Sequence, residues 1–537
     1  MIRETAMPHH DSSGPARLET QVLIIGGGAT GTGLARDLAL RGVHCVLAEK
    51  EDINAGASGA NHGLLHSGAR YVASDIEAAR ECRTEGELLK RLAPHCVEEN
   101  GGMFVAVEGD NEQYIADFPN MCAACGIPTR EIDVATAREL EPVLSSRLIA
   151  AHLVEDASID PFRLSLENIA HARQLGCVFL RDTEVVSFHR PKGIIESALL
   201  RNRKTGEETT VVLDQVINAA GAWAGHVASL AGIHMDMIYS KGTLLVTQKR
   251  LTRRVINRLR PATDADILVP GGTVSILGTT SVRVASPEGV RPTVAEVDLI
   301  IDQGAAMAPV LESTRYIRAY AGVRPLFGSR KEGGDRSVSR GFALLDHAEN
   351  GIENFITITG GKLTTFRLMA EKTADLVCRH LGISAACETA RLPLPKTESS
   401  QWTEPGLAPK IWLRHRDPTD HLLCECDMVP KSVVESIASE LVRCGGGLDV
   451  NALALRSRIG KGPCQGAYCS VRVTAHLYDC GLLSGNQGLP LLREFLRERW
   501  LGQHPLLWDL PLAQSELMQA IHCGFFGIDR DAAGGRE

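Results

Sequence analysis

Four cysteines near the end of the chain have a spacing that suits a metal centre. Cys424 and Cys426 form a C-x-C pair, and Cys464 and Cys469 form a C-x4-C pair. Four thiolates at such spacings bind either a zinc ion or a [2Fe–2S] cluster. Zinc ribbons favour two C-x-x-C pairs, so the wider second pair favours the cluster. The alternative, in which all four thiols are only buried side chains, stays open.

Several basic residues and one histidine between positions 66 and 362 could bind an anionic substrate. His66, Arg70 and Tyr71 stand close together, and Arg324, Arg340 and Lys362 follow later. A substrate phosphate requires at least two fixed cations, and the planar guanidinium group of arginine suits it. A histidine with a pKa near neutrality can accept the proton of an alcohol, so His66 is a candidate base. For His66, the alternative is a cofactor contact without proton transfer. Each arginine taken alone is more typical of a solvated surface than of a functional site.

A strand, a glycine turn and a helix near the N-terminus are expected to position such a site. The apolar run 22–25 is followed by Gly26, Gly28 and Gly31 in the pattern G-x-G-x-x-G. These glycines permit the turn, let the backbone approach a pyrophosphate and let the helix pack on the strand. Glu49 follows a second apolar strand, where its carboxylate accepts hydrogen bonds from a ribose hydroxyl. The pattern predicts a dinucleotide site, with NAD as the default.

Three segments of the chain resemble the FAD-dependent glycerol-3-phosphate dehydrogenases of the D-amino-acid-oxidase superfamily. They are the small-residue loop 52–71, the segment 321–325 around Arg324, and the segment 360–365 with Gly360, Gly361 and Lys362. The resemblance covers residues 21–394 and changes the expected dinucleotide from NAD to FAD. One departure is His66-Ser67-Gly68, where the membrane-bound aerobic members have H-G-G, and it leaves the substrate side of this loop open.

The resemblance implies which residues form the site. The FAD contacts are expected to be Gly26, Gly28, Gly31, Glu49, Ser58, Gly221, Gly360, Gly361 and Thr364. The residues expected to act on the substrate are His66, Arg70, Tyr71, Arg324, Arg340 and Lys362. The glycine pair before a helix start also suits the negative charge that develops near N1 of a reduced flavin.

The cysteine segment is similar to the bacterioferritin-associated-ferredoxin-like [2Fe–2S] domain. This resemblance implies that the ligands are Cys424, Cys426, Cys464 and Cys469, with Cys444 and Cys480 spare. A secondary alcohol gives its hydride to flavin N5 with both electrons at once, whereas an iron–sulfur cluster carries electrons singly.

The complete pattern resembles the anaerobic branch of the family. It implies oxidation of sn-glycerol 3-phosphate to dihydroxyacetone phosphate, with electrons passing to partner subunits and quinone. A 2-hydroxy-acid or amino-acid dehydrogenase of the same superfamily would use the same arginines on a carboxylate. A non-catalytic flavin and iron–sulfur relay is a further alternative.

The expected fold is α/β (α+β), with a Rossmann-like FAD-binding domain, an inserted antiparallel-sheet substrate domain and a small helical C-terminal [2Fe–2S] module. The expected parts are a disordered tail over 1–20, the oxidoreductase domain over 21–394, a linker over 395–420, the cluster domain over 421–475 and a helical region over 476–537. Segments 76–150 and 239–330 are expected to form the substrate domain. The pattern over 76–144 predicts helices, with Cys122 and Cys125 buried rather than reactive.

Bulk composition limits the partners and the location. The 537 residues carry a net charge of −8, which predicts no nucleic-acid partner. No apolar run reaches the roughly 18 to 20 residues that span a bilayer, and the first residues lack a signal-peptide core. We therefore expect a cytoplasmic protein that is attached peripherally to the inner membrane through its partner subunits.

Overall fold

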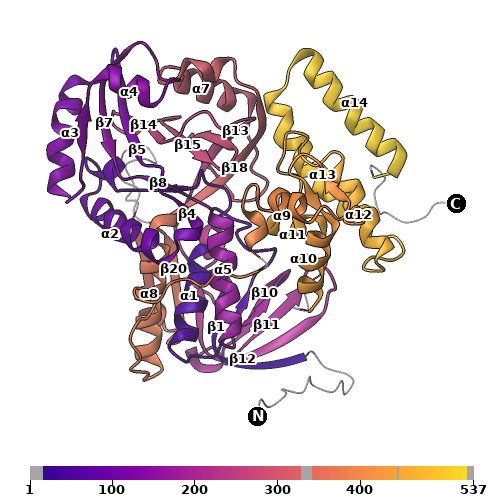
Figure 1. Cartoon of the computed structure of the whole chain (residues 1–537). Helices are drawn as coiled ribbons and strands as arrows, with labels where there is room; N and C mark the ends of the chain where they lie inside the picture. The colour runs from indigo at the N-terminus through magenta and orange to yellow at the C-terminus, as the bar shows by residue number, and fades with distance from the viewer. Residues whose placement is uncertain (1–15, 328–340, 399, 444–446, 529–537) are drawn as a thin grey trace.

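The computed structural model describes residues 16–327, 341–398, 400–443 and 447–528. Two large sheets with the helices that cover them, and a C-terminal group of helices, are the main parts of the described chain (Figure 1). No helix among these residues is both long and apolar enough to cross a membrane. Residues 16–20, expected in a loose tail, are the start of the first strand and pair with the strand that contains Thr209.

The first sheet carries the glycine turn. Its main path runs in the order β10, β11, β12, β1, β2, β9. Off this path, β20 pairs with both β12 and β19. The strands are β1 (Ala16–Ile25), β2 (Cys45–Ala48), β9 (Val178–Leu180), β10 (Thr183–His189), β11 (Ser197–Asn202), β12 (Glu208–Asn218), β19 (Phe342–Asp346) and β20 (Phe355–Gly360). The pairs β1 with β2, β1 with β12 and β12 with β20 are parallel, as in a dinucleotide-binding fold.

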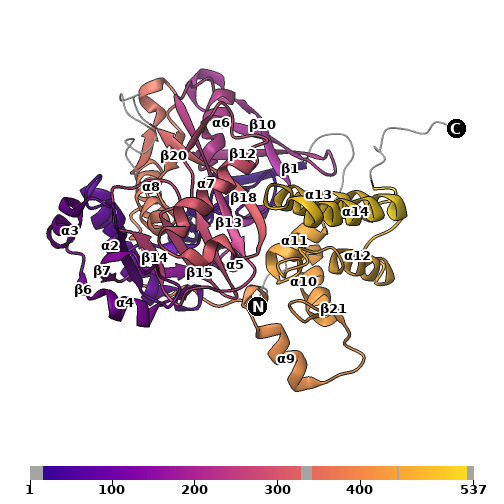
Figure 2. The same ribbon diagram turned by 90° about the horizontal axis from the view of Figure 1, so that it is seen from above.

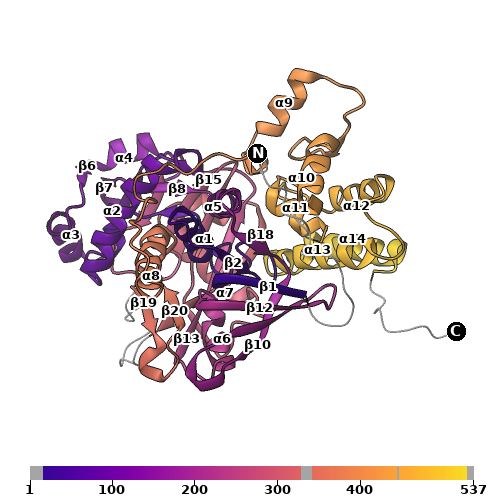
Figure 3. The same ribbon diagram turned by 90° about the horizontal axis from the view of Figure 1, so that it is seen from below.

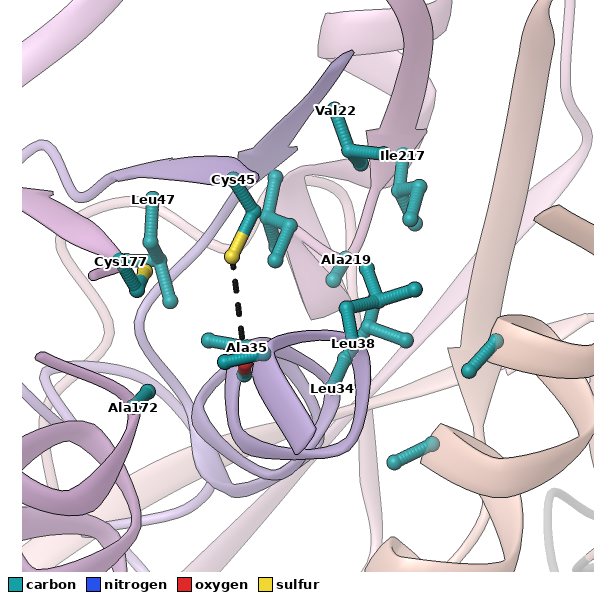
Figure 4. Packing of buried hydrophobic residues seen from close by; sticks show 14 of the residues in the cluster. Val22, Leu34, Ala35, Leu38, Cys45, Leu47, Ala172, Cys177, Ile217 and Ala219 are labelled. Atoms are coloured by element: carbon teal, nitrogen blue, oxygen red, sulfur yellow. Dashed lines mark hydrogen bonds between the residues drawn. The ribbon is translucent and has the colours of Figure 1, made fainter. Parts of the chain in front are cut away.

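Helices cover this sheet because each buries an apolar stripe against it. Helices α1 (Ala29–Leu40), α5 (Pro161–Gln174) and α8 (Phe366–His380) pack on one face (Figure 3), and α6 (Ala224–Leu230) packs on the other. Leu34 and Leu38 of α1 meet Val22 of β1, Ile217 of β12 and Ala219 just after β12 in a buried core (Figure 4). Asp160 caps α5 through the backbone N–H groups of residues 162 and 163, as its position before a proline predicts.

The second sheet unites the two segments expected to form the substrate domain. Its order is β17, β13, β16, β15, β14, β5, β7, β6, with β18 beside β13. The strands are β5 (Gly102–Val107), β6 (Arg130–Ile132), β7 (Leu148–Val154), β13 (Met237–Thr247), β14 (Val255–Arg258), β15 (Ile267–Gly271), β16 (Val274–Gly278), β17 (Val282–Val284) and β18 (Tyr316–Phe327). All pairs are antiparallel except β5 with β14.

The helical expectation for 76–144 is wrong in part. Helices α2 (Ile76–Leu92), α3 (Glu112–Ala124) and α4 (Val134–Leu140) are present, but β5 and β6 lie between them. Every residue of β5 is buried, so it lacks the alternation that reveals a half-exposed strand. Cys122 and Cys125 are buried, as expected.

Helix α7 (Val294–Ala305) packs on the second sheet. The strands β3 (Leu64–Leu65), β4 (Val97–Glu98) and β8 (Ala157–Ile159) form a small third sheet.

The C-terminal part is a compact helical module beside the first sheet (Figure 2). It consists of α9 (Leu407–His415), β21 (Leu422–Cys424), β22 (Val429–Pro430), α10 (Lys431–Arg443), α11 (Val450–Arg456), α12 (Cys469–Asp479), α13 (Gly488–Gln503) and α14 (Asp509–Phe526). Helix α9 lies within 395–420, the range expected to be a linker. Short 3-10 helices occur at Ala69–Tyr71, Pro94–Cys96, Pro191–Gly193, Gly221–Trp223, Pro309–Glu312, His347–Asn350, Leu363–Thr365, Gln401–Thr403 and His504–Leu506.

Candidate functional site

A cavity of about 920 Å³ lies where the two large sheets meet. Most residues singled out in the sequence line it: Gly26, Gly28, Glu49, Ser58, His66, Arg70, Tyr71, Gly221, Arg324, Gly360, Gly361 and Lys362. Gly31 and Thr364 do not line the cavity, but each contacts a residue that does. Gly31 lies against Gly26, and the hydroxyl oxygen of Thr364 accepts a hydrogen bond from the backbone N–H of His66. Arg340 lies outside the described residues. The cavity therefore joins the glycine turn at one end to the histidine and the cations at the other.

The glycine turn is packed too closely for any side chain. Gly26 has a φ of +114°, and a Cβ there would lie 2.5 Å from the carbonyl oxygen of Ala219. A Cβ on Gly31 would lie 1.9 Å from the carbonyl oxygen of Gly26. Helix α1 can thus approach the turn closely only because both positions lack side chains.

The start of α1 faces the cavity with few groups to satisfy its N–H donors. The first turn holds no acidic residue, and Gly28 provides no side-chain cap. Ser58 lies opposite, and its Oγ accepts a hydrogen bond from the N–H of Ala29 at 3.0 Å. A helix N-terminus of this kind favours a bound anion.

Glu49 is a buried carboxyl group beside this turn. Its Oε2 accepts a hydrogen bond from the N–H of Gly27 at 2.6 Å, and its Oε1 accepts one from the N–H of Glu51 at 2.9 Å. Burial raises the pKa of Glu49 to about 7 in spite of these bonds. The carboxyl group is therefore short of donors in this structure, which a ligand with hydroxyl groups would supply.

His66 lies at the other end of the cavity in a neutral form. Its backbone N–H donates to Oγ1 of Thr364 at 3.1 Å, and its Nε2 lies 3.4 Å from the hydroxyl oxygen of Tyr71. Burial lowers the pKa of His66 well below its usual value, and nearby His62, Arg70 and Lys362 lower it further. The imidazole is thus unprotonated over the whole neutral range, but it is a weaker base than the histidine of near-neutral pKa that the sequence predicts.

His62 is a second buried histidine of the same cavity, and no sequence pattern assigned it a role. Burial, Arg324 and Arg70 lower its pKa to about 3. Its ring centroid lies 6.3 Å from that of His66, and within the described chain its Nδ1 has no hydrogen-bond partner. The signal that could have found it is its place in the same small-residue loop as His66.

The cations of the site differ in their surroundings. Arg70 forms an ion pair with the fully buried Asp266 at 3.0 Å. Arg324 donates hydrogen bonds to the hydroxyl group of Thr279 and, at 3.0 Å, to the carbonyl oxygen of Thr280. Asp266 therefore balances the charge of Arg70, whereas these threonines orient the Arg324 guanidinium group without contributing charge. Asp266 could not be recognised from the sequence because it is 196 residues from Arg70.

Tyr71 contacts both Lys362 and His66 at this end of the cavity. The Nζ of Lys362 lies 4.6 Å from the centroid of the Tyr71 ring. Because the hydroxyl oxygen of Tyr71 also lies beside His66, the ring connects a cation to the candidate base. The arrangement can hold an anionic group next to a proton acceptor.

The four cysteines of the C-terminal module form two pairs. The Sγ atoms of Cys426 and Cys464 are 3.6 Å apart. A hydrogen bond between Cys424 and Cys469 lowers the pKa of Cys424 to about 7 and raises that of Cys469. Cys444 lies outside the described residues.

Cys480 belongs to a separate group on the surface of the module. Together with Glu435 and His476 it places three ligand atoms within 4.8 Å of one another, and His476 is already paired with Glu435 at 3.1 Å.

The cysteine module contacts the loop that lines the cavity. Arg456 of the module forms an ion pair with Asp52 at 2.8 Å. Lys461, close to Cys464 in sequence, lies 5.7 Å from the centroid of the Phe162 ring. That ring packs on Gly59, where a Cβ would lie 3.0 Å from its edge. The Phe162 ring thus lies between Lys461 of the module and Gly59 of the loop 52–71.

Comparisons with known proteins identify relatives of this chain. Residues 21–376 match the family model described as FAD dependent oxidoreductase. One subunit of the anaerobic glycerol-3-phosphate dehydrogenase of Escherichia coli (strain K12) is 42% identical over 538 residues, which cover 95% of this chain and 98% of that protein. Subunit A1 of the anaerobic glycerol-3-phosphate dehydrogenase of Haloferax volcanii is 36% identical over 546 residues, which cover 95% of this chain and 91% of that protein.

A solved structure shares the fold. It is the glycerol-3-phosphate dehydrogenase from Bacillus halodurans complexed with FAD, with a TM-score of 0.63, 21% identity, and coverage of 91% of this chain and 96% of that one. Its likeness shows the mixed α/β arrangement of the two large sheets in a second protein.

Proposed function

Because the chain belongs to the FAD-dependent oxidoreductase family, with subunits of anaerobic glycerol-3-phosphate dehydrogenases among its relatives, we propose that it oxidises sn-glycerol 3-phosphate to dihydroxyacetone phosphate. The observation that carries the proposal is the continuous cavity between the glycine turn and the cluster of His66, Arg324 and Lys362. An enzyme of this kind needs its cofactor and its substrate in one enclosed space.

The residues at the glycine end fit FAD. The start of α1 offers N–H donors to a pyrophosphate, with Gly28 leaving the backbone open to it. Glu49 is buried and, among the described residues, accepts from backbone N–H groups, so two ribose hydroxyl groups would complete its hydrogen bonding. Gly221, Gly360 and Gly361 also line this cavity, and their lack of side chains leaves room for a flavin ring. When bound, FAD supplies the acceptor for a hydride and its two electrons.

The residues at the other end fit a phosphorylated alcohol. Arg324 and Lys362 provide positive charge from two different elements, which is what a dianionic phosphate requires. Arg70 acts with Asp266, so it contributes hydrogen bonds more than net charge. His66 accepts the proton of the substrate hydroxyl at Nε2, and Tyr71 beside this nitrogen orients the hydroxyl group.

The cysteine pairs fit a [2Fe–2S] cluster. Such a cluster takes two thiolates on each iron, and two separate sulfur pairs match this requirement better than a single tetrahedral zinc ion does. Bound there, the cluster would supply a one-electron carrier. We include in the proposal that electrons leave through it to partner subunits at the membrane, since the relatives in Escherichia coli and Haloferax volcanii are named as subunits.

An anaerobic titration of the FAD-loaded protein tests the substrate. We expect sn-glycerol 3-phosphate to bleach the visible flavin absorbance, and 2-hydroxyglutarate and amino acids to leave it unchanged. Bleaching by either carboxylate instead would assign the arginines to a carboxylate substrate. No bleaching by any of them would favour a non-catalytic electron relay.

The Arg324→Ala variant tests the phosphate contact. Loss of one charge-assisted hydrogen bond costs about 1.5–3 kcal/mol, so half-maximal bleaching should require about 10- to 100-fold more substrate. FAD content should stay at the wild-type level. Arg201→Ala is the matched control, because Arg201 is exposed and paired with Glu208. Equal losses of FAD and of substrate affinity would show a structural role instead.

A further inference from the structure

A second cavity, of about 1380 Å³, lies between the oxidoreductase domain and the C-terminal module. Most of the loop 52–63 lines it, together with parts of β18, of α13 and of the segment that precedes Cys464. Three cations of this lining, Arg318, Lys461 and Arg499, have no part in the proposed function. Their surroundings indicate what the second cavity binds.

The second cavity is separated from the first where the loop 52–63 crosses β18. At the crossing, the hydroxyl group of Tyr320 donates a hydrogen bond to the carbonyl oxygen of Asn61 at 2.7 Å. Arg318 and Arg324 lie on either side of Tyr320 on the same face of β18, because alternate residues of a strand share a face. Six residues of strand span about 20 Å, and Arg324 lines only the first cavity. An anion held by Arg318 is therefore distinct from the substrate.

The three cations of the second cavity lie close together. Helix α13 packs on β18 through Gly502, where a Cβ would lie 3.2 Å from Nε of Arg318 (Figure 2). Arg499 is one turn before Gly502, so both are on the same face of α13. Burial lowers the pKa of Arg499 well below its usual value, and Arg318 lowers it further. Burial also lowers the pKa of Lys461 to about 7, with Arg458 and Arg499 adding to the effect.

These cations have no anionic partner within the described residues. The side chains of Arg318, Lys461 and Arg499 form no ion pair and no hydrogen bond there, and the Nε of Arg318 is buried. Glu498 attracts both arginines, but its two carboxylate oxygens already accept hydrogen bonds from Arg291 at 3.0 and 2.7 Å. Cations that are withdrawn from water without a partner destabilise the folded protein, and a bound anion would remove this cost.

A cluster held by the four cysteines would balance only part of this charge. Arg499 lies close enough to Cys469 for its pKa to respond to that thiol, so a cluster would attract Arg499. Burial lowers the pKa of Arg318 as well, but no cysteine is among the charged groups that act on it. Arg318 therefore requires a separate anion.

The number of cations favours a phosphoryl group over a carboxylate. A phosphoryl group brings up to two negative charges and three terminal oxygens, whereas a carboxylate brings one charge and two oxygens. We propose that Arg318, Arg499 and Lys461 bind the phosphoryl group of a small soluble molecule, which is free phosphate or a phosphate ester. The ligand would connect β18 of the oxidoreductase domain to α13 of the C-terminal module. The inference does not depend on the proposed substrate.

Equilibrium dialysis of the FAD-loaded full chain against radiolabelled inorganic phosphate tests the site. The double variant Arg318→Gln with Arg499→Gln should bind one phosphate per chain fewer than the wild type, while FAD content and iron content change less than twofold. The matched control is Arg315→Gln with Arg497→Gln, which removes two exposed arginines, one just before β18 and one on α13. The control should bind phosphate as the wild type does. Equal binding by the wild type and the double variant would overturn the proposal and assign these cations to the cluster.

Thermal unfolding separates a ligand site from a structural role. Without phosphate, the Tm of the double variant should equal or exceed that of the wild type, because two unpartnered cations are removed. Saturating phosphate should raise the Tm of the wild type by about 2–5 °C more than that of the double variant. A lower Tm of the double variant without phosphate would show that the cations support the fold, and would overturn the proposal.

Competition against the labelled phosphate identifies the source of the phosphoryl group. Tighter displacement by adenosine 5′-monophosphate than by unlabelled phosphate would identify a phosphate ester, and weaker displacement would identify free phosphate. Displacement by citrate in preference to both would overturn the assignment to a phosphoryl group.

Failure of the second site is distinguishable from failure of the proposed function. The Arg324→Ala variant should retain the phosphate that the double variant loses. Loss of the same phosphate in Arg324→Ala would place it in the first cavity and overturn the second site. Absence of flavin bleaching by sn-glycerol 3-phosphate would overturn the proposed function alone.

Discussion

Glu49 is the residue whose protonation opposes cofactor binding in the folded apoprotein. Burial raises its folded-state pKa to about 7, above the ordinary value of 4.5. The folded apoprotein therefore binds a proton more tightly than the unfolded chain does. Its contribution to stability is complete below about pH 4.5 and is lost as the pH rises to about 7. Ribose hydroxyl groups would favour the ionised form, so FAD and the proton compete.

Glu49→Gln should consequently change stability and cofactor affinity in opposite directions. At pH 8 we expect the Tm of the apoprotein to rise by about 1–4 °C, with no rise at pH 4.5. FAD affinity should fall at least about 10-fold, because an amide accepts weaker hydrogen bonds than a carboxylate. Thermal unfolding at both pH values and FAD titration provide the measurement, with the exposed Glu108→Gln as control. A lower Tm at pH 8 would contradict the assignment.

The rate of flavin reduction should not depend on titration of His66 between pH 6 and 8, whereas a base histidine with an ordinary pKa would make this rate rise with pH. Its pKa lies well below 6.5, so the neutral form is present throughout pH 6–8. The rate of flavin reduction by substrate should therefore show no histidine-dependent rise in this range. His66→Gln should lower that rate by about 10²- to 10⁴-fold with FAD still bound. Anaerobic stopped-flow measurement of both proteins separates titration of the substrate phosphate from that of the enzyme.

A near-normal rate in His66→Gln would leave His66 as a cofactor contact only. His62→Gln is then the informative second variant, because His62 is another neutral histidine of the cavity.

Among the structural elements, the junction of β21 and α12 supplies the buried cysteine pair. Cys424 ends β21 and Cys469 begins α12, so the sheet and the helix fix the distance between the two thiols. Cys426 and Cys464 come from the two neighbouring loops and are less buried. Regular elements thus hold one pair, and loops complete the set.

Cys469→Ser should remove the cluster and leave the flavin site intact. We expect iron content and the reduced-state EPR signal to fall at least about 10-fold, because a [2Fe–2S] cluster needs all four ligands, while FAD content and bleaching by substrate remain. Cys480→Ser is the matched control, since Cys480 lies in the same module but in the separate group with Glu435 and His476. One zinc per chain in the wild type, with no iron, would show that the centre is mononuclear.

At the scale of the whole molecule, an ion-pair network joins the C-terminal module to the first sheet. Asp52 pairs with Arg456 of the module and with Arg181 next to β9. Burial alone would raise the pKa of Asp52, but the two arginines outweigh it and hold the pKa at about 2. The contribution of Asp52 to stability is therefore constant above about pH 4 and is lost as the pH falls toward 2.

Asp52→Asn should loosen the module without harming the catalytic site. Breaking a buried ion pair costs about 3–5 kcal/mol, and less here because Asp52 is partly exposed. We expect limited proteolysis within 395–420 to become at least about 10-fold faster, and electron transfer from flavin to cluster to slow. Glu404→Gln is the matched control, because its pair with Arg163 also crosses the junction but is half exposed. Equal proteolysis of the two variants would contradict this role of Asp52.

Local features of the chain were predictable from sequence because they depend on neighbours in sequence. The β1 turn, α1, β2 and Glu49 follow from a motif of fewer than thirty residues, roughly one supersecondary unit. The cap of α5 by Asp160 follows from an aspartate directly before a proline. Strand β5 did not follow, because complete burial removes the alternation on which strand prediction depends.

The sequence by itself thus determined the conformation of the glycine turn, through glycine's freedom to adopt a positive φ, and thiolate chemistry predicted the four candidate cysteine ligands. Only the tertiary structure decided that Asp266 balances Arg70, that His62 joins His66, and that Asp52 holds the C-terminal module. The physical reason is the same in each case. Burial and charge pairing depend on groups brought together by packing, such as Asp52 and Arg456, which are 404 residues apart.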